Sequence, residues 1–212
     1  MIKAYNEIYL SRMRSTIADA FVYAIEDCNI NPNSFLDMIS ASRIIKRIEN
    51  GELSIIQGIS GVELAMEIIN DTTVKENDIV PLSHYDRSEN YWIGYAYAHY
   101  QWYTSRTFEN IFAAIPYDEM LRLYHTLHEV DISKFVDIAE ERIHKFYKDT
   151  ALKTYRLRLG YSQSELSKLS GVSLRSIQMY KQRNKDINKA AGETLFKLSR
   201  QLNCSIESLL EK

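Results

Sequence analysis

Arg175 and Gln178 lie three positions apart in SLRSIQMYKQR (173–183), and they carry the most specific chemistry in this chain. Residues at that spacing share one face of a helix, which Lys181 and Gln182 would extend. Arginine and glutamine are suited to bidentate hydrogen bonds with the edges of guanine and adenine. Further cations could neutralise phosphates around this face: Lys153, Arg158, Lys168, Arg183, Lys185 and Lys189. The residues therefore predict a surface that binds nucleic acid.

The last 60 residues carry the signals that would hold this face in place. We predict five short helices there, the first over about 150–159. Ser162 and Glu165 have the spacing of a capping box at the start of the second helix. Gly171 permits a tight turn, and Ser173 is a suitable N-cap for the third helix. The predicted core residues are Leu166, Leu169, Ile177, Tyr180, Leu195, Leu198, Leu202, Ile206, Leu209 and Leu210.

Residues 152–211 resemble the Xre family of Cro/repressor-type helix-turn-helix domains. The similarity rests on Arg156, Gly160, Ser162, Gln163, Leu166, Gly171, Val172, Ser173, Ile177 and Leu198. It implies that a helix over 174–182 reads the major groove, with Leu174, Arg175 and Gln178 facing the bases. It also implies that Gln163 contacts a phosphate or the edge of a base and that Ser173 and Ser176 lie near phosphates. We add Lys181 and Arg183 as cations at the DNA edge.

Lys181 departs from the family pattern, in which this position is usually a glutamate that pairs with the arginine of the first helix. That arginine is Arg156 here, so two cations would face one another. An exposed ion pair contributes only about 0–1 kcal/mol, whereas a fully buried leucine contributes about 1.5–3 kcal/mol. We therefore expect the fold to survive, Arg156 to find another acceptor, and Lys181 to contact a phosphate.

The distribution of charge predicts two domains. The net charge of the chain is −2, but residues 1–150 hold 14 Lys and Arg against 23 Asp and Glu, a balance of −9. Residues 151–212 hold 12 against five, a balance of +7. Such asymmetry suggests different partners for the two parts. We predict a dimerisation or partner-binding domain over 1–148, with sub-lobes 1–72 and 88–148, and a DNA-binding domain over 149–212.

The N-terminal part is predicted to be helical, so the fold class is all-α. Apolar residues recur at steps of three and four, only seven Gly and three Pro occur, and no alternating strand pattern survives. Asn33 or Ser34 is expected to cap the second helix, and the polar stretch 71–90 is the predicted loop. The predicted helices cover 5–28, 35–39, 42–50, 60–70, 91–103, 107–114, 118–126 and 132–147.

The aromatic run YWIGYAYAHYQWY (91–103) allows two interpretations. Its rings could stack on nucleic-acid bases, but Arg87 is the only cation between residues 83 and 105, so the electrostatic partner of such stacking is missing. We favour a core or an interface face instead. That face would comprise Trp92, Tyr95, Ala96, His99, Trp102 and Tyr103, while Gly94, Ala96 and Ala98 would permit close helix packing.

Other chemistry finds little support in the sequence. His125 and His128 lie three apart, but no further Cys or His has a metal-ligand spacing, so we expect no metal and no cofactor. The common catalytic motifs are absent, and an N-terminal enzyme would need a pocket around His99, His125 or paired acids. The chain shows neither a signal peptide nor a membrane span, so we expect a cytoplasmic protein.

The leading hypothesis is a sequence-specific, DNA-binding transcriptional regulator that acts as a repressor. We expect a homodimer on double-stranded DNA, because one small domain makes few base contacts. Through SGVELA (60–65), YWIGYAYAHYQWY (91–103) and HEVDISKFVD (128–137), the chain also resembles a group of bacterial regulators with a long helical N-terminal region. That architecture is often found in repressors and antitoxins. The alternative is therefore an antitoxin-like protein that binds a toxin through residues 1–148 and regulates its own operon.

Overall fold

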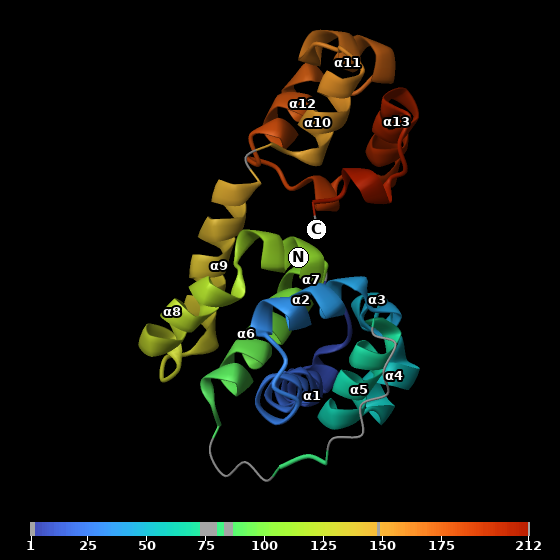
Figure 1. Ribbon diagram of the computed structural model, residues 1–212. Helices are drawn as coiled ribbons and strands as arrows, with labels where there is room; N and C mark the ends of the chain where they lie inside the picture. Colours follow the sequence, from blue (N-terminus) through green and yellow to red (C-terminus); the bar gives the residue numbers. More distant parts are fainter. Residues whose placement is uncertain (1–2, 73–79, 83–86, 148, 212) are drawn as a thin grey trace. The chain divides into compact units, whose positions relative to one another are not determined.

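A computed structural model describes residues 3–72, 80–82, 87–147 and 149–211 (Figure 1). Every regular element among these residues is a helix, which confirms the all-α prediction. The chain divides into two compact units, Ile2–Phe146 and Tyr147–Lys212. The predicted loop over 71–90 falls mainly on residues outside the described ranges.

The N-terminal unit begins with an interrupted first helix. Its predicted range of 5–28 is divided between a 3₁₀ turn, an α-helix and a π-helical turn. Asn31, rather than Asn33 or Ser34, caps the next helix, because its side chain accepts hydrogen bonds from both of those backbone amides (3.0 and 3.3 Å). The elements are η1 (Glu7–Tyr9), α1 (Leu10–Val22), η2 (Tyr23–Asp27), α2 (Pro32–Ala41), α3 (Arg43–Glu49), α4 (Leu53–Gly58), α5 (Gly61–Thr72), α6 (Glu89–Thr104), α7 (Phe108–Ala114), α8 (Tyr117–Leu127) and α9 (Ile132–Phe146).

Helices α1 and α6 pack against each other at the centre of this unit, and α5 packs on α1. The α1–α6 contact depends on Gly94, because a Cβ there would lie 2.9 Å from the Cα of Ala18. Gly61 has the same role between α5 and α1, since its Cβ would lie 2.3 Å from the Cβ of Asp19. The predicted close packing at Gly94 is therefore confirmed.

Helix α6 is buried on most of its circumference, which differs from the predicted single face. Tyr97 and Tyr100 are fully buried, and the Tyr97 hydroxyl donates to the carbonyl of Ile115 at 2.7 Å. Trp102 is also buried and donates from Nε1 to the carbonyl of Tyr5 at 2.9 Å. Four members of the predicted core face are only partly buried: Trp92, Tyr95, His99 and Tyr103.

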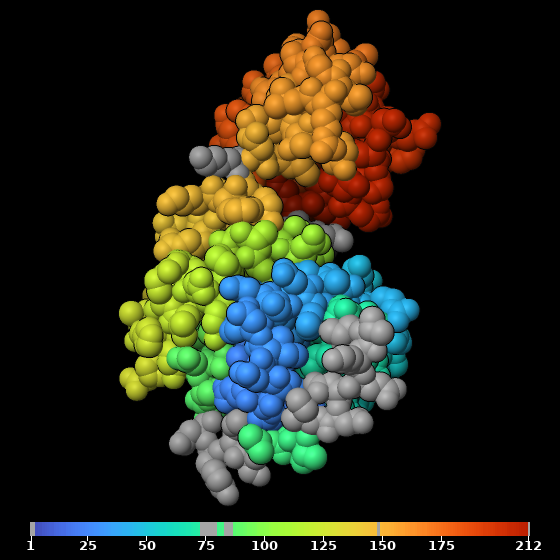
Figure 2. All heavy atoms as spheres, in the orientation of Figure 1, coloured from blue at the N-terminus to red at the C-terminus, as the bar shows by residue number. Residues whose placement is uncertain are grey.

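Helix α2 covers part of the N-terminal unit and contacts α7 and α8. Figure 2 shows the blue atoms of this region with the yellow-green atoms of α8 on one side and the light-blue atoms of α3 on the other. Phe35 anchors α2, because it is fully buried and meets Phe21 of α1 edge to face at 5.3 Å. Of the helices in the described ranges, none combines the length and apolar character needed to span a bilayer.

The C-terminal unit surrounds its own apolar core. Its elements are α10 (Ala151–Arg158), α11 (Gln163–Ser170), α12 (Leu174–Lys181), η3 (Ile187–Lys189), α13 (Gly192–Leu202) and η4 (Glu207–Leu209). The core residues come from all of them and from the α11–α12 turn: Leu152, Leu166, Val172, Ile177, Tyr180, Ile187, Leu195, Leu198, Leu202 and Leu209. One predicted core residue is wrong: Leu169 is 52% exposed, because the inward positions of short α11 are Leu166 and Ser170.

Candidate nucleic-acid interface

A tight turn fixes the direction in which α12 leaves α11. Ser162 and Glu165 form the predicted capping box at the start of α11, with hydrogen bonds of 2.7 and 3.1 Å. The hydrogen bond from the Ser162 amide, followed by that from its hydroxyl, lowers the pKa of Glu165. Gly171 then takes a left-handed conformation (φ 69°) that favours glycine. The turn is thus held by local interactions that the sequence specifies.

Hydroxyl groups supply the remaining hydrogen bonds of this turn. Ser170 donates to the Leu166 carbonyl at 2.6 Å and accepts from the amide of Val172 at 3.2 Å. Ser167 donates to the carbonyl of Val172 at 2.7 Å. These contacts replace backbone hydrogen bonds that the chain loses between two helices. The sequence analysis missed them, although two serines just before a glycine turn are suited to this function.

Helix α12 presents opposite faces to the core and to solvent. Ile177 and Tyr180 are buried, whereas Arg175 and Gln178 are exposed on the other side. Neither exposed side chain is engaged in a hydrogen bond or ion pair with the residues that the structure describes. The arginine and the glutamine are therefore available together on one face, as their spacing predicts.

Small polar residues lie at the start of α12, next to this exposed face. Ser173 caps the helix by accepting from the amide of Ser176 at 3.2 Å, and its hydroxyl donates to the Ser176 hydroxyl at 2.9 Å. Leu174 is 37% exposed and offers an apolar surface beside Arg175. Gln163 begins α11 and is partly buried. The structure thus places four of the predicted contact residues at the helix starts.

The cations of the C-terminal unit fall into two groups. Within the described ranges, no carboxylate lies within 4.0 Å of the side-chain nitrogens of Lys168, Arg175 or Lys181, which belong to α11 and α12. Some cations on other elements are paired, among them Lys197 with Glu193 at 2.6 Å and Lys153 with Asp149. Lys168, Arg175 and Lys181 therefore leave unpaired charge on the two helices of the turn, where it can neutralise phosphates.

Arg156 and Lys181 are the two cations that the sequence analysis expects to face one another. Arg156 is 9% exposed and donates from Nη1 to the carbonyl of Tyr161, at the end of the α10–α11 loop. The expectation that Arg156 finds another acceptor is therefore confirmed. Lys181 is left partly buried, with no acidic partner among the described residues.

Arg183 has a different environment from the other predicted contact residues. Its Nε donates to the carboxylate of Glu211 at 2.9 Å, and its Nη2 donates to the carbonyl of Tyr147 at 2.7 Å. Only 24% of the side chain is exposed. The structure thus does not bring Arg183 to the α12 face, because its guanidinium joins the two ends of the C-terminal unit.

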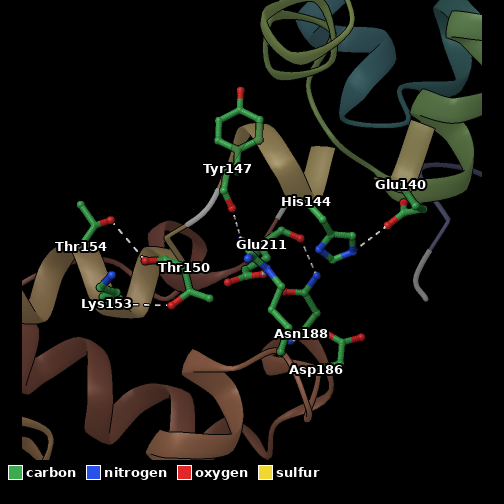
Figure 3. Close-up of polar contacts among 10 residues, drawn as sticks. Glu140, His144, Tyr147, Thr150, Lys153, Thr154, Asp186, Asn188 and Glu211 are labelled. Carbon is green, nitrogen blue, oxygen red and sulfur yellow. Dashed lines mark hydrogen bonds and ion pairs between the residues drawn. The ribbon is translucent and has the colours of Figure 1, made fainter. Parts of the chain in front are cut away.

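Asn188 strengthens the same junction, as Figure 3 shows. Its Nδ2 donates to the Glu211 carbonyl at 2.8 Å, and its Oδ1 accepts from the Glu211 amide at 2.9 Å. At the other end of the unit, Thr150 caps α10 by accepting from the amide of Lys153 at 3.2 Å. Sequence reasoning missed this junction, because its members lie 23 to 36 residues apart.

Comparison with known families decides what this unit is. Residues 152–209 match the family model described as Helix-turn-helix. The C-terminal unit is a Cro/C1-type, Xre-like helix-turn-helix domain. No curated protein and no solved structure matches the chain.

The helix-turn-helix domain supports a general role for the protein as a DNA-binding transcription regulator. Its family is one of DNA-binding rather than catalytic domains. In the described ranges, no three His, Cys, Asp or Glu side chains come together as a metal site would require. Of the histidine pair, His128 follows α8 directly and its Nδ1 lies 2.9 Å from the Tyr124 carbonyl.

Proposed function

We propose that the protein is a sequence-specific repressor that reads the major groove with α12. The observation that carries the proposal is the free, exposed pair of Arg175 and Gln178 on one face of a capped helix. Arg175 would contact guanine and Gln178 adenine, while the exposed Leu174 would meet a thymine methyl group. Bound at an operator, such a domain would exclude other proteins from the same DNA.

The phosphate contacts would come from the residues around that face. Ser173, Ser176 and Gln163 lie at the helix starts, where backbone amides also favour anions. Lys168 and Lys181 add unpaired positive charge on either side. Arg183 would act indirectly, by holding the loop after α12 against Glu211.

We propose that the protein binds as a homodimer, through residues 1–148, and that the boundary to the DNA-binding domain lies at 148/149. A two-fold dimer would read two half-sites about 34 Å apart, which is one turn of B-DNA. Footprinting on the DNA upstream of its own gene tests this arrangement. The expected result is two protected half-sites with related sequences and this spacing, whereas protection that does not depend on sequence would contradict it.

The acidic N-terminal unit supports a second candidate function, that of an antitoxin. Residues 1–150 carry a balance of −9, which suits a basic protein partner. Binding of a toxin would then coexist with autoregulation by the helix-turn-helix domain. Co-expression with a small neighbouring gene tests this alternative: co-purification of the two products supports it, and separate elution favours a stand-alone repressor.

A further inference from the structure

A cleft of about 530 Å³ lies within the N-terminal unit, between α1, α6 and the segment that joins α8 to α9. This volume falls in the range of small-molecule sites. Aromatic side chains form its walls: Tyr91, Trp92 and Tyr95 from α6, and Tyr124 from α8. Charged groups line it as well, so the cleft combines flat rings with fixed charge.

Two cations lie over tyrosine rings of α6, and one of them comes from a distant part of the chain. The guanidinium of Arg14, from α1, lies 4.5 Å from the ring centroid of Tyr95, and that of Arg87 lies 4.9 Å from the centroid of Tyr91. Tyr91 and Tyr95 are stacked, with an interplanar angle of 22°. The argument against stacking, drawn from local sequence, therefore fails, because folding brings Arg14 to the rings.

Arg14 has unused capacity for hydrogen bonding. Its Nη1 lies 3.4 Å from Nδ1 of His99, a long contact, and its buried Nε has no partner in the described part of the chain. No described carboxylate lies within ion-pair distance of Arg14 or Arg87. Because both guanidinium groups line the cleft without a carboxylate partner among the described residues, a ligand anion is a suitable partner for their charge.

Asp131 limits the charge that this ligand can carry. It is the one carboxylate among the described residues of the lining, and hydrogen bonds from the hydroxyl and amide of Ser133 lower its pKa. With Arg14 and Arg87, the ionised carboxylate leaves a balance of +1 among these fixed charges. A monoanion matches that balance, whereas a phosphate monoester with nearly two charges exceeds it.

We propose that this cleft binds a small planar aromatic carboxylate. The ring lies against Trp92 and Tyr124, which meet edge to face at 5.8 Å, and the carboxylate lies at Arg14 and Arg87. Guanidinium groups match carboxylates in geometry, which explains a pair of arginines beside the rings. The site belongs to the N-terminal unit alone and does not depend on DNA binding.

Calorimetry on the full chain with 2-naphthoate tests the proposal. The expected dissociation constant lies below about 1 mM, and Arg14→Gln or Arg87→Gln weakens binding by about tenfold or more, as loss of a charge-assisted hydrogen bond predicts. Arg12→Gln is the matched control, because Arg12 is an exposed cation of α1 outside the cleft and should leave affinity unchanged. Arg87 is exposed, so its variant stays informative if Arg14→Gln fails to fold.

Three further ligands separate ring from charge. 2-Naphthylmethanol has the ring without the charge, and cyclohexanecarboxylate has the charge without a flat ring, so both should bind at least tenfold more weakly than 2-naphthoate. Adenosine monophosphate is an aromatic ligand with greater charge. The proposal is overturned if 2-naphthoate produces no binding heat at millimolar concentration, if any of these three binds as tightly, or if Arg87→Gln behaves like the parent protein.

Discussion

Replacing Lys181 by glutamine is the sharpest test of how the domain uses the cation at the end of α12. In the described ranges Lys181 has no acidic partner, so its removal breaks no ion pair within the domain. Loss of one phosphate contact reduces the slope of log K against log salt by about 0.9 per subunit. If the parent protein and the variant bind equally at 1 M salt, this difference in slope makes the affinity of the variant at 0.15 M salt about fivefold lower per subunit.

Lys181→Glu separates DNA binding from stability. The new carboxylate would restore the usual partner for Arg156, whose guanidinium now binds the Tyr161 carbonyl. The free energy of unfolding should therefore change by no more than about 1 kcal/mol, while DNA affinity falls further than in Lys181→Gln. Thermal denaturation measures the first quantity and fluorescence anisotropy with operator DNA at several salt concentrations measures the second.

The control for both variants is Lys197→Gln. Lys197 lies on α13 and is already paired with Glu193 at 2.6 Å, so its removal should leave the salt slope almost unchanged. An unchanged slope in Lys181→Gln, with a stable protein, would falsify the assignment of Lys181 as a phosphate contact.

Three further predictions concern stability. Arg183→Ala should lower the free energy of unfolding by about 1–3 kcal/mol, because it removes the hydrogen bonds to the Tyr147 carbonyl and the Glu211 carboxylate. Chemical denaturation measures this change, and an unchanged midpoint would contradict the junction. Gly94→Ala should lower the free energy of unfolding by about 1–3 kcal/mol through overpacking against α1. A Tm equal to that of the parent protein would show that α1 and α6 accommodate the extra methyl group without cost. Burial, followed by the nearby Arg14 and Lys3, lowers the pKa of His99 to about 4. Because the unfolded chain then binds the proton more readily, this contribution to stability is present above about pH 6.5 and lost as the pH falls toward 4; His99→Gln should flatten that part of the stability profile in urea titrations, and an identical profile would refute it.

Local signals predicted the helix-turn-helix domain well. The capping box at Ser162 and Glu165, the left-handed Gly171 and the cap at Ser173 involve residues within a few positions of one another. Their hydrogen bonds depend on sequence spacing more than on the rest of the fold. The exposed face of α12 follows directly, because the buried positions Ile177 and Tyr180 fix the orientation of the helix.

Interactions between distant residues could not be predicted in this way. Arg183 was expected at DNA, but its partner Glu211 lies 28 residues along the chain. The cation over Tyr95 is Arg14 of α1, which precedes that tyrosine by more than 80 residues. Both cases are fixed by packing, which brings charges together irrespective of their order in the sequence.

A gel-shift experiment on the DNA upstream of the protein's own gene tests the central claim that α12 reads DNA. The parent protein is compared with the double variant Arg175→Ala, Gln178→Ala, and with Lys197→Ala as the matched control on α13. Each lost bidentate contact should cost about 1–3 kcal/mol, so the double variant should bind at least about 30-fold more weakly while its circular dichroism is unchanged. Equal retardation by the parent protein and the double variant would contradict the claim.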